Sequence, residues 1–276
     1  MYASNSSSPF VLIIGDARRH EFVESRASLD RVGRVVDARS VDEAIAMLDA
    51  SLVAPIVIVV AQSYPGEFSA ESLDRLRRQA PLARIVGMLG SWCEGETRTG
   101  QPWPAAIRLY WHQWIAQAGR EIVELFDGGG SSWSLPNTAT DEERLLIEPS
   151  RPPEKREGLL ALCVERFEAH DWLAATVARR GYSTVWIRPG ERIRAGGVRA
   201  ALFDGTSATD AEMTHLQQLA NGLGSTVPII ALLDFPRIED HDRALSGGAS
   251  AVLSKPLLLD DLFWQLDEVL GGAAVS

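Results

Sequence analysis

The feature that most constrains the fold is a repeated alternation of short apolar runs with helix-compatible segments. The runs are apolar almost throughout, which is typical of strands that are buried on both faces of a sheet. Strands that alternate with helices along the chain form parallel sheets. We therefore expect an α/β fold. In the first half, the predicted strands are 9–16, 34–38, 54–61 and 83–90, and the predicted helices include 40–50 and 69–80.

The same rhythm occurs twice. A stretch rich in Gly, Ser, Pro and charged residues, 128–157, interrupts the pattern and is predicted to be a linker. We expect two tandem doubly wound parallel-sheet domains of the flavodoxin-like type, at 1–127 and 158–276, related by internal duplication. In the second half, the predicted strands are 158–164, 183–189, 198–204, 227–234 and 249–254, and the predicted helices include 171–181 and 211–224.

Composition narrows the class of protein. A formal net charge of −10 argues against a protein that mainly neutralises nucleic-acid phosphates. Cys93 and Cys163 lie in different halves of the chain and are too few for a disulfide framework. The first residues lack the basic region and apolar core of a signal peptide, and no apolar run approaches the ~20 residues of a membrane span. We expect a cytoplasmic protein.

Charged residues follow several predicted strands of the second half. In open parallel sheets, binding groups gather beyond the carboxyl ends of the strands. We therefore expect acids and a lysine to converge at this edge. The residues at these strand ends are Glu165, Asp204, Leu233, Asp234 and Lys255.

The segment GGASAVLSKPLLLDDLFWQL, 247–266, resembles the fifth strand and last helix of the receiver domains of two-component response regulators. The resemblance extends over most of 158–271. In that family, acids after the first and third strands bind magnesium, the third-strand aspartate accepts a phosphoryl group from a histidine kinase, and a lysine pairs with the phosphate. The resemblance implies that Asp204 is the phosphoacceptor, that Lys255 is the phosphate partner, and that Glu165 with Asp204 is what remains of a magnesium site.

Three positions depart from the family pattern. Val164 stands where the first acid belongs, Leu233 where a hydroxyl residue follows the fourth strand, and Val252 where an aromatic residue precedes the lysine. A magnesium ion has little affinity for a depleted oxygen site. Without the hydroxyl and the aromatic side chain, phosphorylation would not be transmitted. We therefore expect little or no phosphoryl acceptance, and no cofactor beyond weakly bound magnesium.

Structural roles for the same charged residues stay open. Asp204 is equally consistent with capping the next helix or ordering a turn. Lys255 is equally consistent with a structural ion pair to Asp204 or Glu165, and Glu165 with a solvated charge.

The first half departs further from the pattern. Asp16 is retained after the first strand, but Ala61 stands near the acceptor position and Leu89 at the hydroxyl position, and no Lys-Pro is present. An alanine side chain cannot accept a phosphoryl group. We expect a degenerate receiver-like domain that serves binding or assembly.

The function we predict is signalling through protein interaction, with a histidine kinase or another signalling protein as partner. The chain has no dinucleotide-binding, Walker or nucleophile-elbow motif, so we do not expect an enzyme. We expect no DNA-binding domain within the chain. Because Trp is enriched at interfaces, the candidate interface residues are Trp111, Trp114 and Trp264.

An alternative function is a small-ligand or catalytic site near the loop from Trp92 to Trp103. Glu94, Glu96 and Arg98 would line such a pocket together with the two indoles.

Overall fold

The computed structural model divides the chain into two compact units, 1–150 and 151–276. Each unit contains one five-stranded sheet in which every pair of neighbouring strands is parallel. The residues that the structure describes are 10–50, 54–94, 96, 103, 106–126, 128, 131–136, 139, 143, 155–191 and 196–271.

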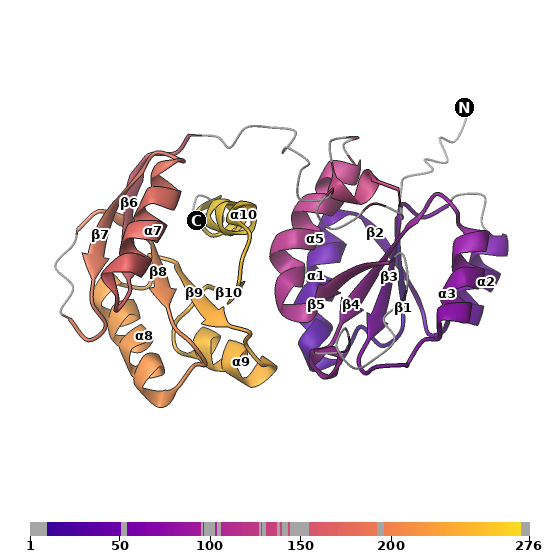
Figure 1. Ribbon diagram of the computed structural model, residues 1–276, viewed down its shortest axis with the longest axis horizontal. Coiled ribbons are helices and arrows are strands. Elements are labelled where there is room, and N and C mark those ends of the chain that lie inside the picture. Colours follow the sequence, from indigo (N-terminus) through magenta and orange to yellow (C-terminus); the bar gives the residue numbers. More distant parts are fainter. Residues whose placement is uncertain are drawn as a thin grey trace, which may run out of the picture. The chain divides into compact units, whose positions relative to one another are not determined.

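The first sheet has the strand order β2-β1-β3-β4-β5. Helices α2 and α3 cover one face of it, and α1 and α5 cover the other (Figure 1). The strands are β1 (Phe10–Ile14), β2 (Arg34–Ala38), β3 (Val57–Gln62), β4 (Arg84–Leu89) and β5 (Ile107–Tyr110). The helices are α1 (Val23–Val32), α2 (Val41–Ala50), α3 (Ala70–Gln79) and α5 (Trp111–Phe126).

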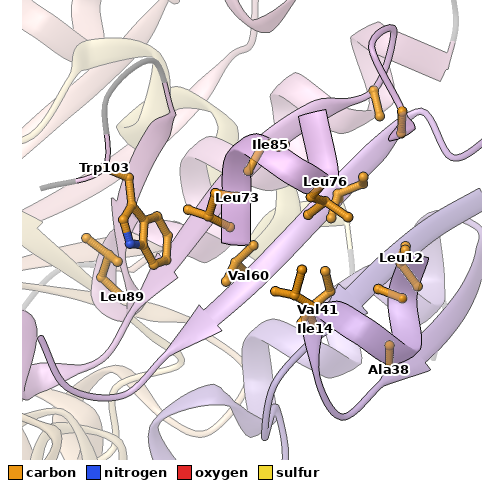
Figure 2. Close-up of a cluster of buried hydrophobic side chains, with 14 of the residues drawn as sticks. Leu12, Ile14, Ala38, Val41, Val60, Leu73, Leu76, Ile85, Leu89 and Trp103 are labelled. Carbon is orange, nitrogen blue, oxygen red and sulfur yellow. The ribbon is translucent and has the colours of Figure 1, made fainter. Parts of the chain in front are cut away.

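The core between the first sheet and helices α2 and α3 explains the apolar runs of this half. Successive side chains of a strand face opposite sides of a sheet, so alternate strand residues point to these helices. Burying one large aliphatic side chain contributes about 1.5–3 kcal/mol, and both faces of each central strand are buried. The side chains labelled in this core in Figure 2 are Leu12, Ile14, Ala38, Val41, Val60, Leu73, Leu76, Ile85, Leu89 and Trp103.

The second sheet has the order β10-β9-β8-β6-β7. Its core on one side joins β8 and β9 to α8 and α9, and α10 contacts β8 and β10. The strands are β6 (Gly158–Cys163), β7 (Tyr182–Ile187), β8 (Val198–Asp204), β9 (Ile229–Asp234) and β10 (Ala251–Lys255). The helices are α7 (Phe167–Ala178), α8 (Asp210–Leu223), α9 (Ile238–Ser246) and α10 (Leu259–Gly271).

Both sheets have the same topology. Numbered within its own unit, each sheet runs second, first, third, fourth and fifth strand, which is the order of flavodoxin-like folds. The predicted tandem of doubly wound, flavodoxin-like folds is therefore confirmed. The sequence patterns did not predict β5, which has only four residues at a sheet edge, or α9, which is short and polar.

Part of the predicted linker, 128–157, packs against the first unit. Glu121 of α5 accepts hydrogen bonds from the hydroxyl of Ser131 at 2.7 Å and from the backbone N–H of Ser132 at 2.7 Å. Trp133 is buried beside them. This segment therefore belongs to the first unit, and the predicted boundaries at 127 and 158 otherwise stay predictions.

The longest helix in the described ranges, α5, has 16 residues. None of the helices described is both long and apolar enough to cross a membrane.

Candidate functional site

Three charged side chains meet where the strands of the second sheet end. The sheet register sets Lys255 opposite Asp234, and Asp204 ends the strand next to β9. Lys255 Nζ lies 2.6 Å from Asp204 Oδ1, 3.0 Å from Asp234 Oδ1 and 2.8 Å from the carbonyl oxygen of Gly205. The expected contact of Lys255 with Asp204 is therefore confirmed, whereas their phosphoryl roles stay predictions.

The Lys255 ammonium forms ion pairs with two carboxylates. Burial by itself lowers the pKa of Lys255, but hydrogen bonds to Asp204 and Asp234, together with their negative charge, outweigh burial and raise that pKa above its ordinary value. The lysine is therefore charged throughout the physiological pH range.

The choice of lysine at this place follows from the geometry. Of the 27 basic residues in the chain, 25 are arginine, and only Lys155 and Lys255 are lysine. Arginine presents a planar fork of donors, whereas an ammonium directs three N–H donors outward from one atom. Three acceptor oxygens lie within 3.0 Å of Nζ, as many as an ammonium has N–H donors.

The loop after β8 is fixed by Glu212, in the first turn of α8. Its carboxylate accepts hydrogen bonds from the backbone N–H groups of Thr206 at 2.6 Å and Thr209 at 2.9 Å, and from both hydroxyls. Burial alone would raise the pKa of Glu212, but these hydrogen bonds lower it below its ordinary value. Thr209 is the N-cap of α8, so the alternative in which Asp204 caps this helix is wrong.

Of the three positions that depart from the receiver pattern, two lie in the core and the third packs against it. Val164 and Leu233 have no exposed surface, and Val252 packs against the cluster formed with α8 and α9. These side chains supply apolar contacts at the places where the receiver resemblance implies an acid, a hydroxyl residue and an aromatic residue.

The residues at these strand ends do not fit a magnesium ion. Glu165 is exposed, and Asp204 forms an ion pair with Lys255. Within the described ranges, no group of three or more His, Cys, Asp or Glu side chains is placed to hold a metal ion.

The sheet registers show which residues of the first unit occupy the equivalent places. Val60 pairs with the last residue of β1 and Phe203 with the last residue of β6. The residues that follow, Ala61 and Asp204, are therefore equivalent, which is consistent with the predicted correspondence.

The lysine position of the first unit follows in the same way. Tyr110 and Ser254 each pair with the leucine that stands at the hydroxyl position of their own unit. The residues that follow, Trp111 and Lys255, are therefore equivalent. The first unit has an indole, 4% exposed, where the second has an ammonium.

A buried polar cluster fills the carboxyl end of the first sheet. Arg108 forms an ion pair with Glu96, whose side chain is 3% exposed. The Gln62 amide nitrogen lies 3.4 Å from Glu96 Oε2 and 3.4 Å from Cys93 Sγ. Removing one member of a buried ion pair leaves an uncompensated charge, so this cluster is a fixed part of the unit.

The described residues do not support the alternative ligand pocket. Trp103 lies in the core beside Leu89 and donates a hydrogen bond from Nε1 to the carbonyl oxygen of Phe68 at 2.9 Å (Figure 2). Glu96 is bound to Arg108, whereas Trp92 is 76% exposed.

Two other predicted lining residues have different positions. Glu94 lies 3.6 Å from the His112 ring nitrogen. Arg98 lies outside the described residues.

The candidate interface tryptophans differ in burial. Trp111 and Trp114 are buried on α5, which packs against α1, β4 and β5. Trp264 on α10 is half-buried. Burial of the first two indicates a packing role, and the interface role of all three stays a prediction.

Sequence reasoning placed Asp234 at a strand end but gave it no partner. It also did not assign Trp111 to the lysine position. Both assignments need the pairing register of neighbouring strands. The available signal for Asp234 was that two adjacent strands end in opposite charges.

No protein-family model matches the chain, and no curated protein does. Solved structures do. A response regulator receiver domain from Methanospirillum hungatei JF-1 is 20% identical, over 44% of this chain and 98% of that one, with a TM-score of 0.37. The receiver domain of a signal transduction histidine kinase from Syntrophus aciditrophicus is 20% identical, over 43% of this chain and 94% of that one, with a TM-score of 0.36. A probable two-component response regulator/GGDEF domain protein is 14% identical, over 96% of this chain and 99% of that one, with a TM-score of 0.37.

Proposed function

We propose that the chain is a signalling or regulatory protein of the two-component response-regulator type. Its receiver-like units act by binding other proteins and accept little or no phosphoryl group. The observation that supports this function best is the contact of Lys255 with Asp204, at the strand ends where the receiver resemblance implies a lysine and a phosphoacceptor.

Poor phosphoryl acceptance follows from the neighbours of that pair. An acceptor aspartate needs a metal ion to neutralise the charge of the incoming phosphoryl group. It also needs a polar side chain that hydrogen-bonds an oxygen of that group. Val164 and Leu233 are core residues at those two places. Asp204 therefore retains the position of an acceptor without its supporting groups.

The first unit supports a role in binding. Ala61 and Trp111 occupy the acceptor and lysine places, so this unit has no group that could be phosphorylated there. A retained fold without its reactive residues is useful as a surface for a protein partner. The partner we propose is a histidine kinase or another signalling protein.

Phosphorylation of the full chain tests this function. The protein is incubated with acetyl phosphate and Mg²⁺, and the intact mass is measured, with Asp204→Asn as the control. In the transfer, a bond forms between Asp204 Oδ and phosphorus, and acetate leaves with the electrons of the broken P–O bond. We expect only trace labelling. Near-stoichiometric labelling that Asp204→Asn abolishes would contradict the proposal.

A further inference from the structure

Asp234 is the one member of the Lys255 cluster to which the receiver resemblance assigns no role. We infer that Asp234 acts as an internal counter-anion of Lys255. Its carboxylate lies where an external phosphate-type anion would contact the ammonium, and it thereby blocks an anion site at the strand ends. This inference rests on the proposed function and specifies how its site is controlled.

The hydrogen bonds of Lys255 show why the site is closed. An ammonium has three N–H donors, and Asp204, Asp234 and the Gly205 carbonyl each lie within 3.0 Å of Nζ. As many acceptor oxygens as donors therefore surround Nζ, and a further ligand has to compete with one of them. An anion can bind Lys255 only if one of these three acceptors leaves.

Asp234 is the acceptor that can leave most readily. Its contact with Nζ is the longest of the three, at 3.0 Å, and its side chain is 52% exposed. Asp204 is closer, at 2.6 Å, and its side chain is 25% exposed. The carbonyl of Gly205 is held by the backbone, because the Gly205 N–H donates to the carbonyl of Leu232 at 2.9 Å.

The net charge of the cluster also identifies Asp234 as the residue that blocks the site. Two carboxylates and one ammonium carry a formal charge of −1, which repels an incoming anion. Without Asp234, the remaining Asp204 and Lys255 carry no net charge, and one N–H donor is released. A single substitution therefore changes both the charge and the hydrogen-bonding capacity of the site.

The main chain at Asp234 is fixed by the neighbouring loop. Its N–H donates to the carbonyl of Thr206 at 2.8 Å, which ties the end of β9 to the loop after β8. The next residue, Phe235, adopts a left-handed backbone with φ of 43° although its side chain is 65% exposed. A non-glycine residue in this conformation is strained, and such strain is retained where surrounding contacts hold it and is concentrated at functional sites.

Selective acylation of lysine tests the inference, because Lys155 and Lys255 are the only lysines in the chain. The full chain is treated with a limiting acylating reagent at pH 8, with and without inorganic phosphate, and the rate at each lysine is read by peptide mass. In the wild type, we expect Lys255 to react at least about tenfold more slowly than the exposed Lys155, and phosphate to change neither rate. In Asp234→Ala, we expect Lys255 to react several-fold faster, and phosphate to restore its protection. Asp234→Asn removes the charge but keeps an acceptor oxygen, so we expect the same changes to a smaller extent.

Glu239→Gln is the matched control, because it removes one exposed carboxylate from the first turn of α9. We expect it to leave the Lys255 rate unchanged. The inference is overturned if both Asp234 variants leave that rate unchanged, or if phosphate protects Lys255 equally in the wild type. It is also overturned if the rate rises but phosphate has no effect, because Asp234 would then be only an ion-pair partner. None of these results depends on labelling by acetyl phosphate, so the proposed function stands or falls separately.

Discussion

Replacing Lys255 with methionine measures how much the ion cluster stabilises the second unit. Methionine keeps most of the apolar stem and removes the ammonium. The contacts of 2.6 Å and 3.0 Å would be strong in a dry interior, but the three side chains are 25–52% exposed. Partly exposed pairs contribute about 0.2–1 kcal/mol each. Since Lys255→Met also leaves Asp204 and Asp234 facing each other, we expect the free energy of unfolding to fall by about 1–2 kcal/mol.

The two cysteines allow each unit to be followed separately in the full chain. Cys93 is buried in the first unit and Cys163 in the second. Burial, with a smaller effect of the Asp204 and Glu191 charges, raises the pKa of Cys163 to about 12, so its thiol is protonated and protected while the unit is folded. The rate of thiol labelling across a urea series, read by peptide mass, therefore reports unfolding of the second unit at Cys163 and of the first at Cys93.

Salt and pH sharpen this prediction. The Debye length falls to about 3 Å at 1 M salt, so the difference between wild type and Lys255→Met should shrink there. The raised pKa means that the stabilisation by Lys255 is fully present below the ordinary lysine value of about 10.4, and is lost as pH rises through the higher folded value. The difference should therefore be constant from pH 6 to pH 9. Lys155→Met, which removes an exposed lysine, should leave Cys163 labelling unchanged. Equal midpoints for wild type and Lys255→Met at low salt would refute the reasoning.

Two further predictions concern the second unit. Arg180 is 4% exposed and donates to both oxygens of Asp267 on α10, at 2.9 and 2.7 Å. Because Asp267 is 36% exposed and also lies 3.6 Å from Arg156, Arg180→Met should lower the free energy of unfolding by about 1–2 kcal/mol, read by thiol labelling. A loss below about 0.5 kcal/mol would contradict a structural role for this ion pair. Glu212→Gln should cost about 1 kcal/mol at pH 7. The pKa of Glu212 is lowered in the folded unit, so its stabilising contribution is present above the ordinary Glu pKa and is lost as pH falls through the folded pKa. The free energies of unfolding of wild type and Glu212→Gln should therefore converge below about pH 4. A constant difference down to about pH 3 would be inconsistent with this reasoning.

The fold was predictable because its main signal is local. Buried central strands such as β3 and β8 are continuous apolar runs, and the chain repeats them with helices between. The elements that sequence reasoning missed lack that signal. β5 has four residues and contains Arg108, whose charge is paired with Glu96 across the unit. Such a strand becomes recognisable only through its partners.

The candidate site was predictable in part for the same reason. Lys255 and Asp204 each follow an apolar run, so their place at the sheet edge follows from the run itself. The partnership of Asp234 with Lys255 depends on the register of β9 against β10, which single-strand patterns do not determine. The sequence suggested Asp204 as a cap of the next helix because it is an acid at the end of the preceding strand. The N-cap is Thr209 instead, immediately before the helix.

The two units differ at two equivalent positions, and the two positions are either both charged or both uncharged. In the first unit both places are uncharged, with Ala61 and the buried indole of Trp111, and in the second both are charged, with Asp204 and Lys255 in contact. A half-changed pair would leave one partly buried charge without its counter-charge, which costs more than losing both. The unit that retains the pair also carries Asp234, the acid that completes the hydrogen bonds of the lysine. The pairing of Lys255 with Asp204 and Asp234 is therefore a structural reason for a basic residue at this position, in a chain whose only other lysine is Lys155.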